Sequence, residues 1–110
     1  MKAIKISTDE TIKVVEIDSG PTSMDRLTCL QDQVGGLIEF LDVDGKMAAI
    51  INEEGKLKGL PYNLLGTMFA HQYCGLFSQD SIVGDMLLVG TNEEGDTIDV
   101  PETAMVLVQR

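Results

Sequence analysis

The sequence predicts a single α+β domain over residues 1–110, in which a mostly antiparallel sheet built from hairpins carries one or two helices packed on it. Three observations support this prediction. The length of 110 residues suits one domain with one core. Short apolar segments rich in β-branched residues alternate with turn sequences, and two longer segments with helical periodicity interrupt them. Because neighbouring strands are joined by short links, antiparallel pairing is favoured.

The N-terminal third of the chain predicts a hairpin followed by a helix. Residues 3–6 and 12–17 are strand-like and flank the turn formed by residues 7–10. Gly20-Pro21 ends the second strand, and Thr22 or Ser23 can cap a helix. That helix is expected from Ser23 to Gln33, because apolar residues recur there at spacings of three and four. The pair Gly35-Gly36 is expected to end it.

The middle of the chain predicts a second hairpin and a second helix. Residues 37–41 and 47–51 form strands around the turn Asp44-Gly45. Asn63 to Cys74 is the second helix candidate, because large apolar side chains again line one face.

The C-terminal part of the chain predicts further strands. The apolar segment 82–89 is expected to be a central strand, and residues 97–100 are expected to pair back on it. The tail 101–108 is ambiguous, since Pro101 suits a first helical turn and the apolar run that follows suits a strand.

A short motif occurs twice, as Asn52-Glu53-Glu54-Gly55 and as Asn92-Glu93-Glu94-Gly95, each time after an apolar run. Asn favours the start of a turn, and Gly supplies the positive φ that a hairpin loop needs. The repeat therefore predicts two hairpin tips. The alternative, in which the two Glu pairs are catalytic or metal-binding carboxylates, is less favoured because two separate tips rarely converge.

The charge balance narrows the class of partner. Eight Lys and Arg stand against eighteen Asp and Glu, so the formal net charge is 8 − 18 = −10. This excludes a protein that binds the nucleic-acid backbone, which requires a basic surface. It permits plain solubility, a basic protein partner or mimicry of the charge of DNA. No targeting or membrane-spanning segment is visible, and Cys29 and Cys74 suit reduced thiols, so we expect a cytoplasmic protein.

No residue pattern predicts catalysis, a cofactor or a metal site. His71 and Cys74 would share a helix face, but zinc requires four ligands and this sequence has one His and two Cys. Asp42 to Gly45 resembles part of a calcium loop, but the ligand positions of that loop would fall on Phe40 and Ile51. We therefore expect a protein that is not an enzyme.

One segment concentrates features of a binding site. Lys56 and Lys58 lie beside residues that bring backbone freedom, stiffness and hydrogen-bonding groups. The predicted ligand-binding residues are Lys56, Lys58, Gly59, Pro61, Tyr62 and Asn63. A second interpretation remains open, in which the segment is an exposed edge strand whose lysines prevent aggregation.

Three motifs carry a family resemblance. Residues 34–39 (VGGLIE), residues 52–63 (NEEGKLKGLPYN) and Ile82-Val83-Gly84 resemble a family of phages and plasmids that is known as a domain of unknown function (3846). The resemblance covers roughly residues 1 to 100. It implies an accessory protein of a mobile element and assigns no chemistry.

Such a setting suggests a counter-defence protein that acts in the host cell, and two mechanisms fit the chain. In the first, an oligomer sequesters a host immune nucleotide, with Lys56 and Lys58 on phosphates and Tyr62 or Asn63 on a base. In the second, the acidic surface acts as a DNA mimic or as an inhibitor that binds a host defence or regulatory protein. A homo-oligomer, most simply a dimer, is expected because residues 47–51 and 86–89 are apolar on both faces.

Overall fold

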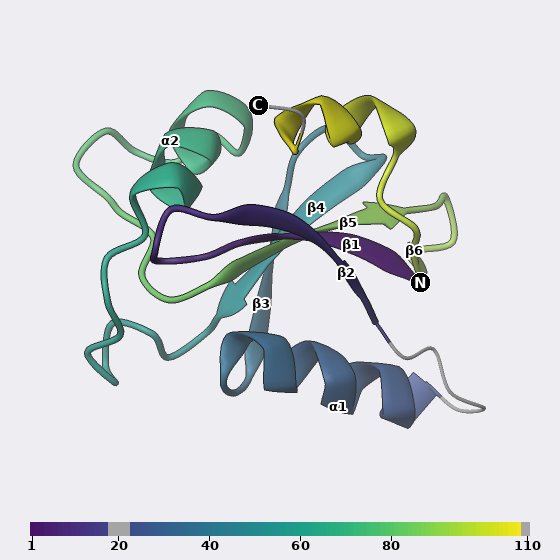
Figure 1. Ribbon diagram of the computed structural model, residues 1–110, viewed down its shortest axis with the longest axis horizontal. Helices are drawn as coiled ribbons and strands as arrows, with labels where there is room; N and C mark the ends of the chain where they lie inside the picture. The colour runs from purple at the N-terminus through teal and green to yellow at the C-terminus, as the bar shows by residue number, and fades with distance from the viewer. Residues whose placement is uncertain (18–22, 109–110) are drawn as a thin grey trace.

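A computed structural model describes residues 1–17 and 23–108 of the chain (Figure 1). The expected break at Gly20-Pro21 and a cap from Thr22 lie outside the described residues. The helical elements are α1 (Ser23–Val34), α2 (Leu64–Tyr73) and the 3₁₀ helix η1 (Glu102–Leu107). The strands are β1 (Lys2–Ile6), β2 (Ile12–Glu16), β3 (Ile38–Asp42), β4 (Met47–Asn52), β5 (Met86–Thr91) and β6 (Thr97–Ile98).

The described strands form one six-stranded antiparallel sheet with helices on both faces. The order is β2-β1-β5-β4-β3, and β6 pairs with the end of β5. Figure 1 shows α1 below the sheet and α2 with η1 above it. The α+β class with a mostly antiparallel sheet is confirmed.

The two central strands are covered on both faces by the helices of the same chain. Ala48 and Ile50 pack in the cluster that contains Leu30 and Val34 of α1. Ala49 packs on the other face with Phe69 of α2. In β5, Met86, Leu87, Leu88 and Val89 are all fully buried. One chain therefore supplies the cover for which a second copy was expected, so this reason for a dimer falls away and the oligomeric state stays a prediction.

Both predicted helices are confirmed, with ends set by local chemistry. The carbonyl of Gln31 accepts from the N–H groups of Gly35 (2.8 Å) and Gly36 (3.0 Å). Gly35 has φ +81, so the pair closes α1 with a left-handed residue that favours glycine. Asn63 caps α2, as the position before the first apolar turn implies.

The two Asn-Glu-Glu-Gly motifs form the same local turn in different settings. In each, the Asn side-chain oxygen accepts the N–H two residues later, at 2.8 Å for Asn52 and 3.0 Å for Asn92. The turn at 92–95 joins β5 to β6, and Gly95 has φ +83, so this hairpin tip is confirmed. The tip predicted at 53–55 is wrong, because the chain runs from β4 into turns over residues 53–59 and then to α2.

The reason for that difference lies at Gly55. Gly55 is not in the left-handed region, unlike Gly95. It lies instead against residue 83, where a Cβ would come within 2.9 Å of Val83 Cγ2. At this position the absence of a side chain lets two loops pack closely, and it does not serve to reverse the direction of the chain.

Two boundaries differ from the prediction, and one open alternative is decided. The central strand begins at Met86, four residues later than expected, because Gly84 has φ +76 and interrupts the extended backbone. The strand that pairs back on β5 covers residues 97–98 and not 97–100. The ambiguous tail is helical, as η1. Within residues 1–17 and 23–108, no helix is long and apolar enough to span a membrane.

Candidate functional site

The predicted binding segment is a turn region and not an edge strand. After β4 ends at Asn52, residues 53–59 form consecutive turns, and only Tyr62 makes a β-bridge, to Val83. The alternative interpretation of an edge strand guarded by lysines is therefore wrong for this segment. The two lysines lie on turns that pack beside the loop of residues 76–83.

Lys56 is held by a carboxylate of that neighbouring loop. Its ammonium group contacts Asp80 Oδ1, and Asp80 Oδ1 also accepts from the Ser81 N–H at 2.8 Å. Mainly because of the hydrogen bond from Lys56, the pKa of Asp80 lies below its usual value of 3.8. The Asp80 carbonyl is 2.8 Å from His71 Nε2, so α2 joins the same contact network.

The Lys58 side chain has different partners from those of Lys56. Its ammonium group lies 3.9 Å from Glu54 Oε1. It also lies directly over Gly36, where a Cβ would meet Lys58 Nζ at 2.8 Å. A cation near the end of α1 interacts favourably with the negative end of the helix dipole. The two lysines thus have different partners and do not form a shared anion site in this structure.

The remaining predicted residues divide into exposed and buried groups. Gly59 adopts φ +66, and Tyr62 is 52% exposed. The Pro61 carbonyl accepts from the Gly84 N–H at 2.7 Å. These residues hold the 53–62 segment against the start of β5 and leave the Tyr62 ring partly open to solvent.

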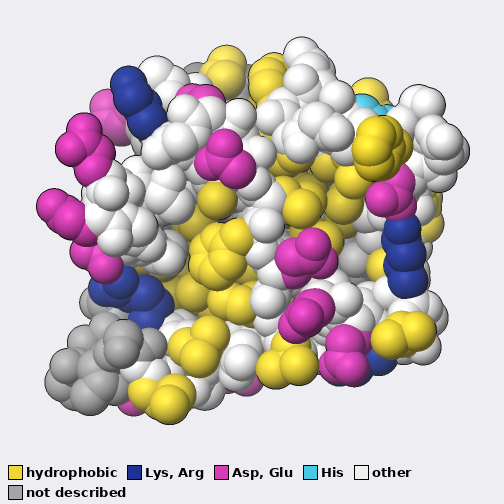
Figure 2. Space-filling view, turned by 180° about the vertical axis from the view of Figure 1, so that it is seen from behind, with side chains coloured by type: hydrophobic (Ala, Val, Ile, Leu, Met, Phe, Trp, Pro, Cys, Tyr) yellow, Lys and Arg dark blue, Asp and Glu magenta, His cyan; other side chains and the backbone are white. Residues whose placement is uncertain are grey.

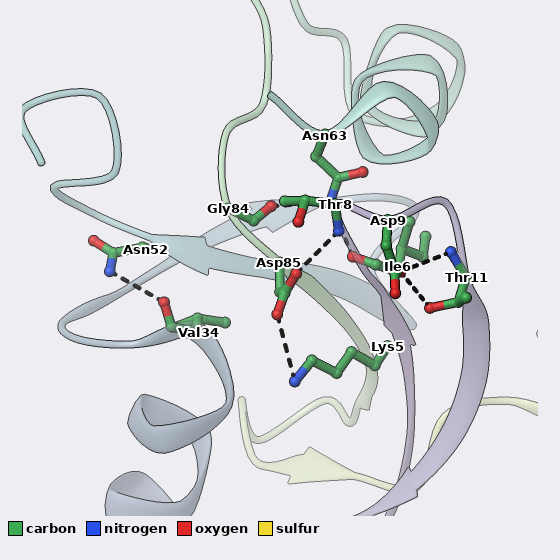
Figure 3. Close-up of polar contacts among 10 residues, drawn as sticks. All are labelled: Lys5, Ile6, Thr8, Asp9, Thr11, Val34, Asn52, Asn63, Gly84 and Asp85. Carbon is green, nitrogen blue, oxygen red and sulfur yellow. Dashed lines mark hydrogen bonds and ion pairs between the residues drawn. The ribbon is translucent and has the colours of Figure 1, made fainter. Parts of the chain in front are cut away.

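Asn63 has a structural role. It is fully buried, and its amide donates to the carbonyls of Ile6 and Gly84, both at 2.9 Å (Figure 3). Its side-chain oxygen accepts from the Gly66 N–H at 2.8 Å. All of these partners belong to the protein, so the hydrogen-bonding groups of the Asn63 side chain are used within the fold. Its position just before an apolar helical turn is the sequence signal for this capping role.

A groove of about 200 Å³ lies between β3, the 53–57 turn and the 76–83 loop. It has an apolar lining on which carboxylates are placed. The apolar side chains are Leu41, Ile51, Leu57, Leu76, Ile82 and Val83. The carboxylates in the lining are Glu39, Glu53 and Asp80. Among the described residues that line the groove, the positive charge comes from Lys56.

The groove is electrostatically negative. Lys56 is already paired with Asp80, so Glu39 and Glu53 remain as net negative charge around an apolar lining. Figure 2 shows the corresponding face, with hydrophobic side chains gathered in its middle and acidic side chains among and around them. Such a site attracts a cation next to an apolar group and opposes an anion.

Of the predicted site residues, Lys56 lines this groove, whereas Lys58, Gly59, Pro61, Tyr62 and Asn63 do not. The groove residues that the sequence did not single out include Glu39, Leu41, Leu76 and Asp80. Glu39 and Leu41 belong to one face of β3 by strand alternation, so the pattern of that strand held a signal. Leu76 could not be placed there without the tertiary fold.

His71 and Cys74 form no chemical pair. Burial, together with the nearby Asp42 carboxylate, raises the pKa of the Cys74 thiol, which keeps it in its protonated, unreactive form. Among residues 1–17 and 23–108, no three His, Cys, Asp or Glu side chains are arranged to hold a metal ion.

Comparison with known proteins defines the family of the chain. No curated protein and no solved structure matches it. A family model matches residues 1–110, the whole length of this sequence. In this structure the segments 34–39, 52–63 and 82–84 contact one another, through the bond from Asn52 to the Val34 carbonyl and the bond from the Gly84 N–H to the Pro61 carbonyl. The chain is a member of the family described as Domain of unknown function (DUF3846).

Proposed function

We propose that this chain is a non-enzymatic binding protein that engages a basic protein partner through the groove beside β3. The observation that carries the proposal is the pair of carboxylates, Glu39 and Glu53, on an apolar lining whose lysine is already neutralised by Asp80. A basic side chain with an adjacent apolar residue satisfies both parts of this surface.

The two parts of the groove contribute differently to binding. The apolar lining supplies affinity, at about 25 cal/mol for each Å² removed from water. Exposed ion pairs add only about 0.2–1 kcal/mol each, but they select the partner and raise the association rate. The net charge of −10 extends this attraction over the whole surface.

The family resemblance suggests the setting of this activity. In a phage or plasmid accessory protein acting in the host cytoplasm, the basic partner would be a host defence or regulatory protein. A DNA-binding protein is a suitable target, because its basic surface is complementary to a strongly acidic chain. The role is then counter-defence by occupying the surface of that protein.

Sequestration of a nucleotide signal is the second candidate, and one observation favours it. The Lys56 side chain is 59% exposed at the rim of the groove, so it can reach a phosphate. An anionic ligand would have to replace Asp80 as the partner of Lys56 and to approach Glu39 and Glu53. This competition makes a nucleotide the weaker candidate.

A calorimetric titration with two kinds of probe tests the proposal. The first probe is a capped octapeptide of alternating Lys and Val, and the second is a panel of cyclic nucleotides. We expect the peptide to bind, and the double substitution Glu39→Gln/Glu53→Gln to weaken that binding by about tenfold, because two exposed ion pairs are lost. Added salt should weaken the wild type more than the variant.

The matched control is Glu93→Gln/Glu94→Gln, which removes the same charge from the β5–β6 hairpin tip. It should leave peptide binding within about twofold of the wild type, since those carboxylates are not in the groove. If the nucleotides bind, the peptide does not, and Lys56→Ala abolishes nucleotide binding, the second candidate replaces the first.

A further inference from the structure

The outer edge of β3 carries backbone groups that β4 leaves unused. At the two ends of the pair, the Glu53 N–H donates to the Leu37 carbonyl (2.8 Å) and the Val43 N–H donates to the Met47 carbonyl (3.0 Å). With the register in which Phe40 faces Ile50, these bonds direct the odd-numbered residues of β3 toward β4. Hydrogen-bonded and non-bonded pairs alternate in an antiparallel ladder. The even-numbered residues therefore point their N–H and C=O groups outward.

This edge is open in the described part of the chain. β3 ends the strand order, and no described strand pairs with its outer side. Phe40, in the middle of the strand, is 49% exposed. The outward groups belong to Ile38, Phe40 and Asp42, which together form a template for another extended segment.

The charges on this edge select the kind of segment that can pair with it. β3 carries Glu39 and Asp42 and no cation, whereas the opposite edge strand, β2, carries Lys13 as well as Glu16. Like charges on neighbouring strands are destabilising and opposite charges are favourable. An acidic edge on a chain of net charge −10 therefore repels a second copy and attracts a basic strand.

The two faces that flank β3 specify an alternating pattern. On one face, Glu39 and Leu41 line the acidic groove described above. On the other face, Ile38 and Phe40 line a shallow depression with Leu27, Leu30 and two opposite charges, Arg26 and Asp96. The side chains of an added strand would reach these faces in turn. Basic residues fit the first face, which carries net negative charge. Apolar residues fit the second face, where Arg26 and Asp96 offset each other and the remaining large side chains are apolar.

We propose that the partner binds by strand addition at β3, through an extended segment in which basic and apolar residues alternate. Its main chain pairs with the outward groups of Ile38, Phe40 and Asp42. Its basic side chains lie over Glu39 and Glu53, and its apolar side chains lie over Ile38 and Phe40. This inference rests on the proposed binding of a basic partner and adds the way in which that partner is recognised.

Phe40→Pro compared with Phe40→Ala tests the main-chain part of the proposal. Both variants lose the ring, but only proline loses the outward N–H and places its own ring in the path of the added strand. Because that N–H does not bond to β4, proline is compatible with this edge position. A thermal melt of each variant checks that the fold is retained. With the Lys-Val octapeptide as probe, Phe40→Pro should bind about tenfold more weakly than Phe40→Ala.

β2 provides the matched control. Bonds from the Ser7 N–H to the Thr11 carbonyl and from the Ile17 N–H to the Met1 carbonyl direct odd-numbered residues of β2 toward β1. The backbone N–H and C=O groups of Val14 therefore point outward from β2, as those of Phe40 do from β3. Val14→Pro and Val14→Ala should bind the peptide equally. A second probe is the same octapeptide N-methylated at every Val, the residues placed opposite Ile38 and Phe40, so that the edge facing β3 cannot donate. It should bind much more weakly.

The outcomes separate this inference from the function on which it rests. If the peptide binds and Glu39→Gln/Glu53→Gln weakens it, while Phe40→Pro equals Phe40→Ala, strand addition is overturned and the basic partner stands. If the peptide does not bind the wild type even at about millimolar concentration, both proposals fail. If sedimentation shows a wild-type dimer that Phe40→Pro converts to a monomer, the edge serves a second copy and the proposal is wrong.

Discussion

At the scale of single residues, asparagines organise the loops of this molecule. Asn63 joins the end of β1, the start of β5 and the first turn of α2. Asn52 donates to the Val34 carbonyl at 3.1 Å and so ties β4 to the end of α1 (Figure 3). Each amide uses both its donor and its acceptor, which a carboxylate of the same shape could not do. Buried amides of this kind give the loops a single arrangement.

We predict that Asn63→Ala strongly destabilises the protein. The change removes three hydrogen bonds from a fully buried site, one of which caps a helix, for a loss of about 2–4 kcal/mol in the free energy of unfolding. Urea denaturation followed by circular dichroism measures it. Asn63→Asp keeps the cap acceptor but repels both carbonyls, so it should be no better than alanine. The control is Asn92→Ala at a half-buried position, which should cost about 1 kcal/mol or less. If Asn63→Ala cost less than about 1 kcal/mol in the free energy of unfolding, the structural role of Asn63 would be contradicted.

A second prediction concerns the Lys56–Asp80 contact. Because the folded-state pKa of Asp80 is lowered, its stabilising contribution is present above the unfolded value of 3.8 and is lost as the pH falls through the folded pKa. An NMR titration of the Asp80 carboxyl group should show a pKa below 3.8 in the wild type and a value closer to 3.8 in Lys56→Ala. The Asp9 carboxyl serves as an internal control, since the Thr11 side chain and not Lys56 lowers its pKa. An unchanged Asp80 value in Lys56→Ala would mean that the two groups do not interact in solution.

At the scale of elements, the sequence predicts regular structure well and connections less well. Both helices follow from apolar spacing and from the residues that bound them, Asn63 before α2 and Gly35-Gly36 after α1. The hairpin tip at 92–95 follows from its turn residues. The same residues at 52–55 mislead, because a turn motif specifies the local bend and not which strand pairs next. That choice depends on the contact between Gly55 and Val83, residues far apart in the sequence.

The candidate site shows the same limit. Lys56 could be singled out as an unusual cation in an acidic chain, but its partner Asp80 lies 24 residues away in the sequence. The acidic character of the groove arises from three separate segments, around Glu39, Glu53 and Asp80. No local pattern in the sequence indicates that these segments converge. The sequence alone therefore predicts an anionic ligand, whereas we propose a basic one from the charges that the fold brings together.

We predict that Gly55→Ala is destabilising and that Val83→Ala relieves it. The new methyl group would overlap Val83 Cγ2, which overpacks the contact by about 1–3 kcal/mol. Removing the Val83 methyl groups opens the space, so the double variant should lose less than the sum of the two single losses. Denaturant unfolding of the four proteins gives the coupling energy. Gly45→Ala is the comparison at a site with nothing within 4 Å, where only the φ of +82 opposes a side chain. Strict additivity would show that the two loops do not pack as described.

At the scale of the whole molecule, excess negative charge is the dominant feature. A formal charge of −10 on 110 residues opposes the compact state through self-repulsion. The described ion pairs offset this only locally. They are the Met1 N-terminus with Glu16, Lys5–Asp85, Lys56–Asp80 and Lys58–Glu54. Stability is therefore carried by the two buried clusters on either side of the sheet and not by surface electrostatics.

We predict that salt stabilises this protein near neutral pH. Raising sodium chloride to about 0.5 M shortens the screening length to a few Å and weakens the repulsion among the carboxylates. The melting temperature should rise at neutral pH, and the rise should shrink close to the sequence isoelectric point of about 4.2. Calorimetric scans at the two pH values measure the difference. A fall in melting temperature with salt at neutral pH would show that attractive pairs outweigh the excess charge.

The position of β5 in the sheet has a consequence for how the chain folds. β1 with β2, and β3 with β4, are neighbours in sequence, so each hairpin can close over a short loop. β5 lies between them and pairs Leu88 with both Ile4 and Ala49, which lie far earlier in the chain. During synthesis the two hairpins leave the ribosome before the strand that joins them, with the apolar edge of β4 unpaired. The interval before β5 arrives is therefore the stage at which the nascent chain is most exposed to aggregation and most dependent on chaperones.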